Sequence, residues 1–220
     1  MKKADLHIHS LYSPDAISKP ETIMEMAAAR SLDFIAITDH SSTAAWNELK
    51  RLERHYPVKV ILGQELQLWN GKYPDGDILG LFLQHPIRST GLKNILQEIQ
   101  AQGGIACIAH PFCERRGEFR AFDQIDDWQN IAIEARNGRI LKRRNNEMAE
   151  GLAHRIHLPF TAGSDAHTPF EIGNVYVEWS GRSAHDLKQA ILNRDVSIHG
   201  DASSVFFSFI SEFGRLGISI

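Results

Sequence analysis

The stretch Lys3-Ala4-Asp5-Leu6-His7-Ile8-His9 carries the pattern from which the fold is inferred. It is typical of a short β-strand, and it ends in two histidines separated by one residue. Side chains at positions i and i+2 of a strand point to the same face, so both imidazoles can reach one metal ion. Taken alone, this motif fits a polar strand edge equally well, because it is short.

Similar apolar runs recur along the chain, and six further runs complete a set of seven: 34–37, 58–62, 78–83, 105–109, 131–133 and 160–162. Short apolar runs bounded by turn residues are typical of strands buried on both faces of a parallel sheet. All but one of the seven runs carry a metal-ligating type of residue at or just after the C-terminal end. The run 78–83 is instead preceded by Asp77.

Helices are expected between most of these strands, at 21–30, 43–55, 92–102, 139–157 and 184–193. The spacing of Ser18-Lys19-Pro20-Glu21 is that of a capping box at the start of the first helix. Strands that alternate with helices predict an α/β fold, either a barrel or an open doubly wound sheet.

The polar strand ends separate these two architectures. A βα barrel gathers its functional groups at the C-terminal ends of many strands, whereas an open sheet concentrates them at one switch point. The sequence therefore favours an irregular seven-stranded (β/α)7 barrel with its active site at the C-terminal ends of the strands.

The composition is that of a single globular domain over residues 1–220, with 43% hydrophobic residues, 23% charged residues and a formal net charge of −3. No broad basic surface for nucleic acid is indicated. Two cysteines, Cys107 and Cys113, cannot build a disulfide framework and favour a reducing compartment. No apolar run is long enough to span a bilayer. We therefore expect a cytoplasmic protein, with an apolar tail at 205–209 that packs on the body or on another subunit.

Several of the 11 histidines share short motifs with Asp or Glu. Each motif is weak by itself; Asp15, for example, follows Pro14 in a sequence typical of a turn. Burying so many ionisable groups together is costly unless cations are present, and bound metal ions remove that cost. Imidazole mixed with carboxylate suits Zn, Mn or Fe.

The sequence resembles the polymerase and histidinol phosphatase (PHP) family. The matching motifs occur in the family's order: Asp5-Leu6-His7-Ile8-His9-Ser10, Ile37-Thr38-Asp39-His40, Gly63-Gln64-Glu65, Ala109-His110-Pro111 and Gly163-Ser164-Asp165-Ala166-His167. The resemblance implies an irregular seven-stranded βα barrel that holds up to three metal ions and hydrolyses phosphoesters.

Carried over residue by residue, the resemblance implies one ion on His7, His9, Glu65 and Asp165, which together hold a metal-bridging hydroxide as the nucleophile. Glu65 bridges to a second ion, which also takes His110. A third ion is implied on Asp15, His40 and His167. Many members have a histidine where this chain has Asp77, which either ligates the second ion through oxygen or leaves that ion weakly held.

Phosphate is bound well by arginine, because the guanidinium is planar and bidentate. The candidates for substrate binding are Arg115, Arg116 and Arg136, each of which fits solvated surface charge equally well.

The leading hypothesis is a metal-dependent phosphoesterase that acts on a small phosphate ester, a metabolite or a nucleotide, with two or three divalent ions. One alternative is a nuclease or proofreading phosphodiesterase, which the lack of a basic patch disfavours. Another is a non-catalytic domain, which the complete ligand set disfavours. The expected partner is a small phosphorylated substrate rather than nucleic acid or a membrane, and no oligomeric state is predicted.

Overall fold

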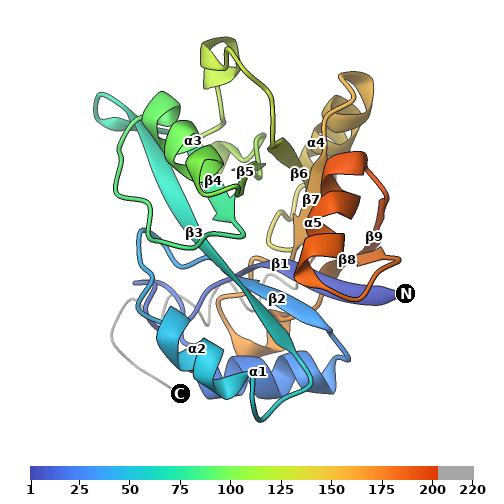
Figure 1. The fold of residues 1–220 in the computed structure, drawn as a ribbon. Coiled ribbons are helices and arrows are strands. Elements are labelled where there is room, and N and C mark those ends of the chain that lie inside the picture. Colours follow the sequence, from blue (N-terminus) through green and yellow to red (C-terminus); the bar gives the residue numbers. More distant parts are fainter. Residues whose placement is uncertain (203–220) are drawn as a thin grey trace.

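The structure, a computed structural model, describes residues 1–202, so the apolar tail 205–209 lies outside the described part (Figure 1). Within these residues, nine strands form one sheet in the order β7-β6-β5-β4-β3-β2-β1-β8-β9. They are β1 (Lys2–Ile8), β2 (Phe34–Ile37), β3 (Lys59–Asn70), β4 (Tyr73–Leu81), β5 (Ile105–Ala109), β6 (Ile131–Asn137), β7 (Phe160–Gly163), β8 (Val175–Trp179) and β9 (Val196–Gly200).

The sheet curves into a nearly closed barrel, because the end of β7 returns to β1. The backbone N–H of Asp165 donates to the carbonyl of His7 at 2.8 Å, and Ile8 and Ala166 form a parallel bridge. A Cβ on Gly163 would lie 2.5 Å from the backbone nitrogen of His7, so only glycine fits this junction. The predicted barrel-shaped α/β sheet is confirmed.

The predicted number of seven strands is wrong for the described part of the chain, where the sheet has nine strands. β8 and β9 extend it beyond β1 as antiparallel strands. Buried and half-buried residues alternate along β8, which is the pattern of a strand with one buried face. The search for continuous apolar runs that end in ligand residues therefore missed both strands.

The strict alternation of strands and helices also breaks between β3 and β4. Only Gly71 and Lys72 join these strands, a connection too short for a parallel crossover, so β4 runs antiparallel to both β3 and β5. The N-terminal half of β4 therefore lies at the edge where the parallel strands end. Asp77 is paired there with Gln67 of β3 and Ala109 of β5.

Five α-helices lie around the sheet in the described part of the chain: α1 (Pro20–Ala29), α2 (Trp46–Leu52), α3 (Leu92–Ala101), α4 (Arg143–Arg155) and α5 (Ala184–Asn193). α5 has the predicted bounds, whereas α2 and α4 are shorter than predicted. The predicted capping box at Ser18 is wrong, because Lys19 occupies the N-cap position of α1 and no side chain caps it. Pro20 keeps the preceding residue extended, which leaves Ser18 one position too early.

The apolar side chains pack in two buried clusters. One joins Ile23 of α1, Leu49 of α2 and Ile99 of α3 to the strands, and the other includes Leu6 and Ile191 of α5. Burying each such side chain contributes about 1.5–3 kcal/mol. Within residues 1–202, no helix has both the length and the hydrophobicity that a membrane span requires.

Candidate metal centre

Glu65, near the middle of β3, is the centre of the site, and its side chain is fully buried. His7 Nε2 lies 3.4 Å and His9 Nε2 lies 3.2 Å from Glu65 Oε2. His40 Nδ1 is 3.1 Å from the same oxygen, and His110 Nε2 is 3.2 Å from Oε1. Four histidines from three places in the chain therefore meet one carboxylate.

Among residues 1–202, three sets of side chains each bring three ligand atoms within 4.8 Å of one another. We name them the inner group (His7, His9 and Asp165), the middle group (Glu65, Asp77 and His110) and the outer group (His9, His40 and His167). The sets lie side by side, because His9 belongs to two of them and Glu65 contacts residues of all three.

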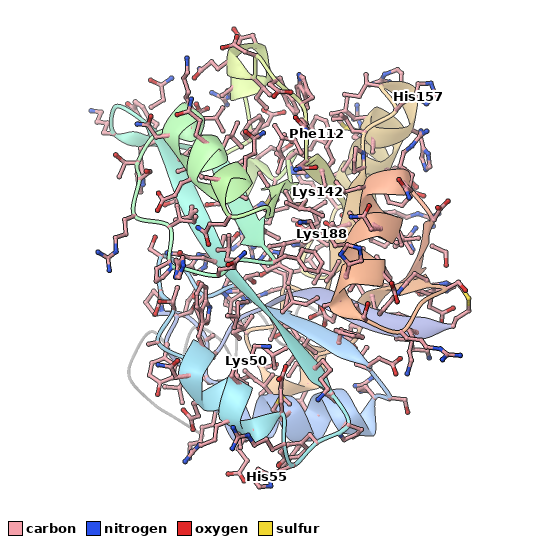
Figure 2. The ribbon with its side chains drawn as sticks, viewed as in Figure 1. Lys50, His55, Phe112, Lys142, His157 and Lys188 are labelled. Atoms are coloured by element: carbon pink, nitrogen blue, oxygen red, sulfur yellow. The ribbon has the colours of Figure 1, made fainter. Side chains whose placement is uncertain are left out.

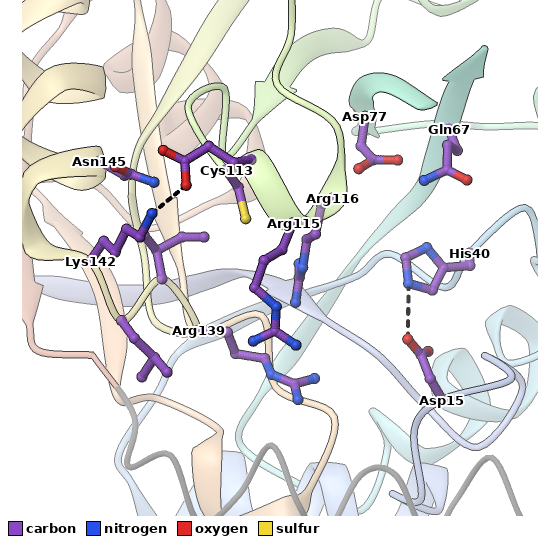
Figure 3. A pocket seen from close by; sticks show the side chains of 13 residues that line it. Asp15, His40, Gln67, Asp77, Cys113, Arg115, Arg116, Arg139, Lys142 and Asn145 are labelled. Carbon is purple, nitrogen blue, oxygen red and sulfur yellow. Dashed lines mark hydrogen bonds and ion pairs between the residues drawn. The ribbon is translucent and has the colours of Figure 1, made fainter. Parts of the chain in front are cut away.

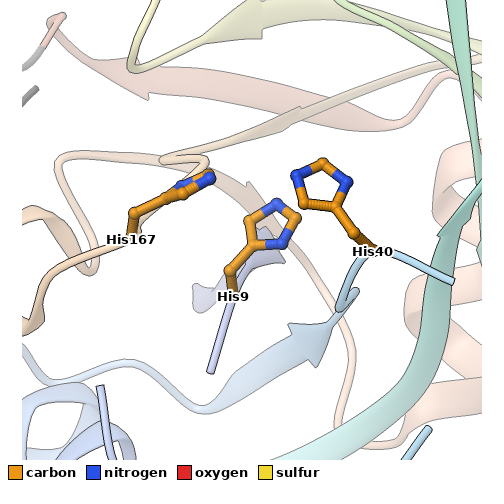
Figure 4. A group of neighbouring side chains, drawn as sticks. All are labelled: His9, His40 and His167. Carbon is orange, nitrogen blue, oxygen red and sulfur yellow. The ribbon is translucent and has the colours of Figure 1, made fainter. Parts of the chain in front are cut away.

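The three rings of the outer group face a common space (Figure 4). The ring centroid of His9 lies 4.5 Å from that of His40 and 4.3 Å from that of His167. Asp15 adds a carboxylate, with Oδ2 at 3.3 Å from His167 Nε2 and 3.6 Å from His40 Nε2. All nine residues predicted as metal ligands thus lie in one centre.

Other histidines lie away from this centre. His55 and His157 are on opposite outer ends of the molecule (Figure 2). Clustering is therefore a property of the motif histidines and not of histidine in general.

Divalent metal ions fit this centre. Three buried atoms, Asp77 Oδ1, His110 Nδ1 and Asp165 Oδ1, have no hydrogen-bond partner among the described residues. His7 Nε2 and His9 Nε2 lie 3.0 Å apart, where two lone pairs would repel each other unless a proton or a cation lay nearby. Buried polar atoms without partners cost free energy, and coordination to a cation would remove that cost.

The pKa values of the centre are displaced in opposite directions. Burial disfavours a charged His40 imidazole, but the charges of Glu65 and Asp15 outweigh burial and raise its pKa to about 9. Burial and the neighbouring His9 lower the pKa of His167 to about 3. Burial and the charge of Glu65 raise the pKa of Asp77 to about 6. His167 is therefore neutral at physiological pH, which is the form that ligates metals.

A cavity of about 440 Å³ opens beside the ligands (Figure 3). Asp15, His40 and Asp77 lie on one side of it, and arginines from two loops lie on the other. The loop that contains Glu114–Arg116 brings Arg115 and Arg116, and the loop after β6 brings Arg139, which was not predicted. Anionic and cationic walls thus face each other across one pocket.

The three arginines predicted to bind substrate lie in different places. Arg115 is exposed and lines the pocket. Arg116 also lines it but forms an ion pair with Oδ2 of Asp165. Arg136 is not brought to this pocket, because its guanidinium lies 3.2 Å from Glu150 Oε2 and 3.2 Å from the Gly200 carbonyl.

Two buried residues of β6, Glu134 and Asn137, were not predicted as part of the centre. Glu134 Oε1 lies 2.9 Å from His7 Nδ1, and Asn137 Nδ2 donates to Asp165 Oδ2 at 3.1 Å. In the sequence, Glu134 is only the residue of a metal-ligating type that follows the apolar run 131–133. The signal that would have found both is the short polar sequence Glu134-Ala135-Arg136-Asn137 at the end of a buried strand.

Comparison with known proteins finds one matching family model and several relatives. A family model described as PHP-associated matches residues 143–196. The uncharacterized protein MJ1587 of Methanocaldococcus jannaschii is 34% identical over 135 residues, which cover 55% of this chain and 75% of that protein. The PolC-type DNA polymerase III of Caldanaerobacter subterraneus is 32% identical over 111 residues, which cover 47% of this chain and 8% of the polymerase.

One solved structure has the same fold over most of the chain. It is a two-domain protein of Bacteroides vulgatus, described as containing a predicted PHP-like metal-dependent phosphoesterase. The TM-score is 0.75 at 19% sequence identity, over 91% of this chain and 65% of that one. This chain belongs to the PHP family.

Another relative of this PHP protein has a named substrate. The 3′,5′-nucleoside bisphosphate phosphatase of Chromobacterium violaceum is 30% identical over 96 residues, which cover 43% of this chain and 33% of the phosphatase. Both this phosphatase and the polymerase extend well beyond the part that this chain matches. The match therefore does not show that this chain has the activity of either complete protein.

Proposed function

We propose that this PHP protein is a metal-dependent phosphoric ester hydrolase that acts on a small phosphate ester. One observation carries the proposal: Glu65 contacts histidines of all three groups of candidate metal ligands, and these lie at one side of a pocket whose other side carries Arg115 and Arg139. Cations on both sides of a bound phosphoryl group would neutralise its charge. The relatives named as phosphoesterase and phosphatase support the same chemistry.

We further propose that two or three divalent ions of Zn, Mn or Fe are held by the inner, middle and outer groups. Such ions supply a nucleophilic water at neutral pH and neutralise charge on the phosphoryl oxygens. In the middle group, Asp77 takes the place of the more usual histidine and offers Oδ1, which has no hydrogen-bond partner among the described residues. No serine or cysteine nucleophile is required.

The arginines have separate tasks in this proposal. Arg115 offers its guanidinium donors to the phosphoryl oxygens, since it is exposed in the pocket. Arg139 lies beside it, with Nε 3.5 Å from Glu171 Oε1. Arg116 holds Oδ2 of Asp165, which leaves Oδ1 directed at His9 and His7 at 3.4 and 3.5 Å.

The size of the pocket favours a small substrate. A cavity of about 440 Å³ fits one small molecule, whereas a nucleic-acid strand needs an extended basic groove. Lys142, which also lines the pocket, is already paired with Glu114. Few cations therefore remain for a polyanionic backbone.

The experiment compares specificity constants under one metal, with Mn²⁺-loaded protein. The substrates are nucleoside monophosphates, sugar phosphates and single-stranded oligonucleotides, and a Glu65→Gln variant controls for contaminating phosphatases. We expect hydrolysis of the small esters and little processive cleavage of nucleic acid. If oligonucleotides are preferred by about tenfold or more, which is about 1.4 kcal/mol in transition-state binding, the protein is a nuclease instead. Full hydrolytic activity in metal-free protein would overturn the proposal altogether.

A further inference from the structure

Glu134 of β6 is a buried carboxylate behind the inner group, and only 1% of it is exposed. Three N–H donors converge on it. Oε1 lies 2.9 Å from His7 Nδ1, and Oε2 accepts from the backbone N–H of His110 at 2.8 Å and from Asn137 Nδ2 at 3.0 Å. None of these residues lines the pocket, so Glu134 contacts the centre from the side that faces away from the pocket.

The contact with His7 determines which ring nitrogen carries the proton. A neutral imidazole has one N–H, and an ionised carboxylate can only accept a hydrogen bond. In the neutral form that ligates a metal, the proton of His7 is therefore on Nδ1, and the lone pair is on Nε2. That nitrogen faces His9 Nε2 at 3.0 Å and Asp165 Oδ1 at 3.5 Å, where a metal ion would bind.

The contact with His110 acts through the backbone. His110 has φ of 29°, in the left-handed region that residues with a Cβ rarely adopt. The hydrogen bond from its N–H to Glu134 holds this conformation. The ring Nε2 then lies 3.2 Å from Glu65 Oε1 and 3.9 Å from Asp77 Oδ2, within the middle group.

Asn137, which is fully buried, extends this arrangement to Asp165. Its side-chain nitrogen donates both to Glu134 Oε2 and to Asp165 Oδ2, at 3.0 and 3.1 Å. Its Oδ1 accepts from the backbone N–H of Arg139 at 2.9 Å, which fixes the orientation of the amide. Asp165 thus keeps Oδ1 for the inner group.

We infer that Glu134 and Asn137 are positioning residues that set the metal affinity of the inner and middle groups together. Glu134 orients one ligand of the inner group through its ring and one ligand of the middle group through its backbone. The inference rests on the proposed function for the presence of divalent ions, and it is independent of the substrate. It predicts that a change at Glu134 weakens both groups although Glu134 ligates neither.

The informative variant is Glu134→Gln, which keeps the shape of the side chain. Glutamine offers one acceptor oxygen and one NH₂ group, while three donors converge on this position. Whichever way the amide turns, either the His7 N–H or the His110 N–H faces another N–H. Thr161→Val is the matched control: Thr161 is paired with Glu134 across the sheet, and its hydroxyl contacts Cys107 Sγ at 3.0 Å rather than a ligand.

The measurement is a titration of the metal-free protein with Co²⁺, followed by visible absorption, so that no substrate is involved. Because changing a residue that orients a ligand typically costs 10–100-fold in metal affinity, we expect Glu134→Gln to weaken Co²⁺ binding by about that factor and to shift the absorption bands. Asn137→Ala is expected to weaken binding by about tenfold. Thr161→Val should bind Co²⁺ as the unchanged protein does.

Asn137→Ala decides the question if Glu134→Gln does not fold. Wild-type Co²⁺ affinity and spectra in the folded variants at positions 134 and 137 would overturn the inference. So would a loss in Thr161→Val as large as that in Glu134→Gln, since a general loss of packing would then explain both. If unchanged protein binds Co²⁺ but hydrolyses no phosphate ester, the proposed function fails while this inference stands. If unchanged protein binds no Co²⁺, both fail.

Discussion

The inner and outer groups use the same residue types in different surroundings. His7 and Asp165 are fully buried, and Glu134 and Asn137 hold them from behind. In the outer group, the side chain of His40 is 30% exposed and that of Asp15 is 18% exposed, at the wall of the pocket. Burial therefore separates a position where an ion would be retained from one where it would exchange with solvent.

Glu65→Gln should weaken metal binding in the inner and outer groups alike, because Glu65 contacts histidines of all three groups. We expect hydrolysis to fall by about a thousandfold or more, which is about 4 kcal/mol of transition-state stabilisation. Elemental analysis of the purified variant should show less metal than the unchanged protein. A variant with unchanged metal content and rate would show that Glu65 is not shared between the groups.

The comparison is sharpened by changing one histidine from each group. His7→Ala leaves Glu134 buried without its imidazole partner. We therefore expect the free energy of unfolding of the metal-loaded protein to fall by about 3 kcal/mol. His40→Ala removes a half-exposed ring and should cost less than about 1 kcal/mol, with loss of metal from the outer group only. Thermal denaturation and metal content measured together test this order. Equal losses in both variants would mean that burial does not distinguish the groups.

The middle group is tested through Asp77. Asp77→Ala removes an oxygen that lies 3.9 Å from His110 Nε2, and the metal affinity of the middle group should fall by about tenfold. Metal content after dialysis against limiting metal measures this fall, and activity is expected to decrease with it. If Asp77→Ala keeps the metal content and kinetics of the unchanged protein, Asp77 is not a ligand and only lines the pocket. If the variant only binds substrate more weakly, Asp77 acts on the site without ligating a metal ion.

The smallest effect is expected on the cationic side of the pocket. Arg115→Ala should raise KM by about tenfold, or about 1.4 kcal/mol, because one charged contact to phosphate is lost. Arg136→Ala is the control, since Arg136 contacts Glu150 and Gly200 outside the pocket. KM values measured on one small phosphate ester separate the two. A larger effect at Arg136 than at Arg115 would contradict the assignment of the pocket wall.

The predicted ligands were assigned from the resemblance to the PHP family, and local geometry explains in part why they lie close together. His7 lies near the end of β1 and His9 directly follows that strand, and Asp165 and His167 repeat the same spacing just after β7. Parallel strands end at one edge, so residues far apart in sequence meet there. The direction of β4 was not predicted, although Gly71 and Lys72 between two strand-forming runs are a hairpin connection.

Arg136 shows why strand periodicity alone was insufficient. It lies two residues after Glu134, so a regular strand would direct both side chains to the centre. The pairing of β6 with β7 shifts register between these two residues, which is a bulge. A bulge redirects the side chains that follow it. Arg136 consequently pairs with Glu150 of α4, and Asn137 reaches the centre instead.

The junction between β1 and β7 also has a consequence for the order of folding. Ser164 donates its backbone N–H to Asp5, which is 159 positions away in the chain. Such distant contacts form late, because a long loop must be closed before they are gained. During synthesis, the N-terminal histidines therefore emerge from the ribosome long before Asp165 can join them. Capture of a metal ion by the inner group would thus report that the end of β7 has docked against β1.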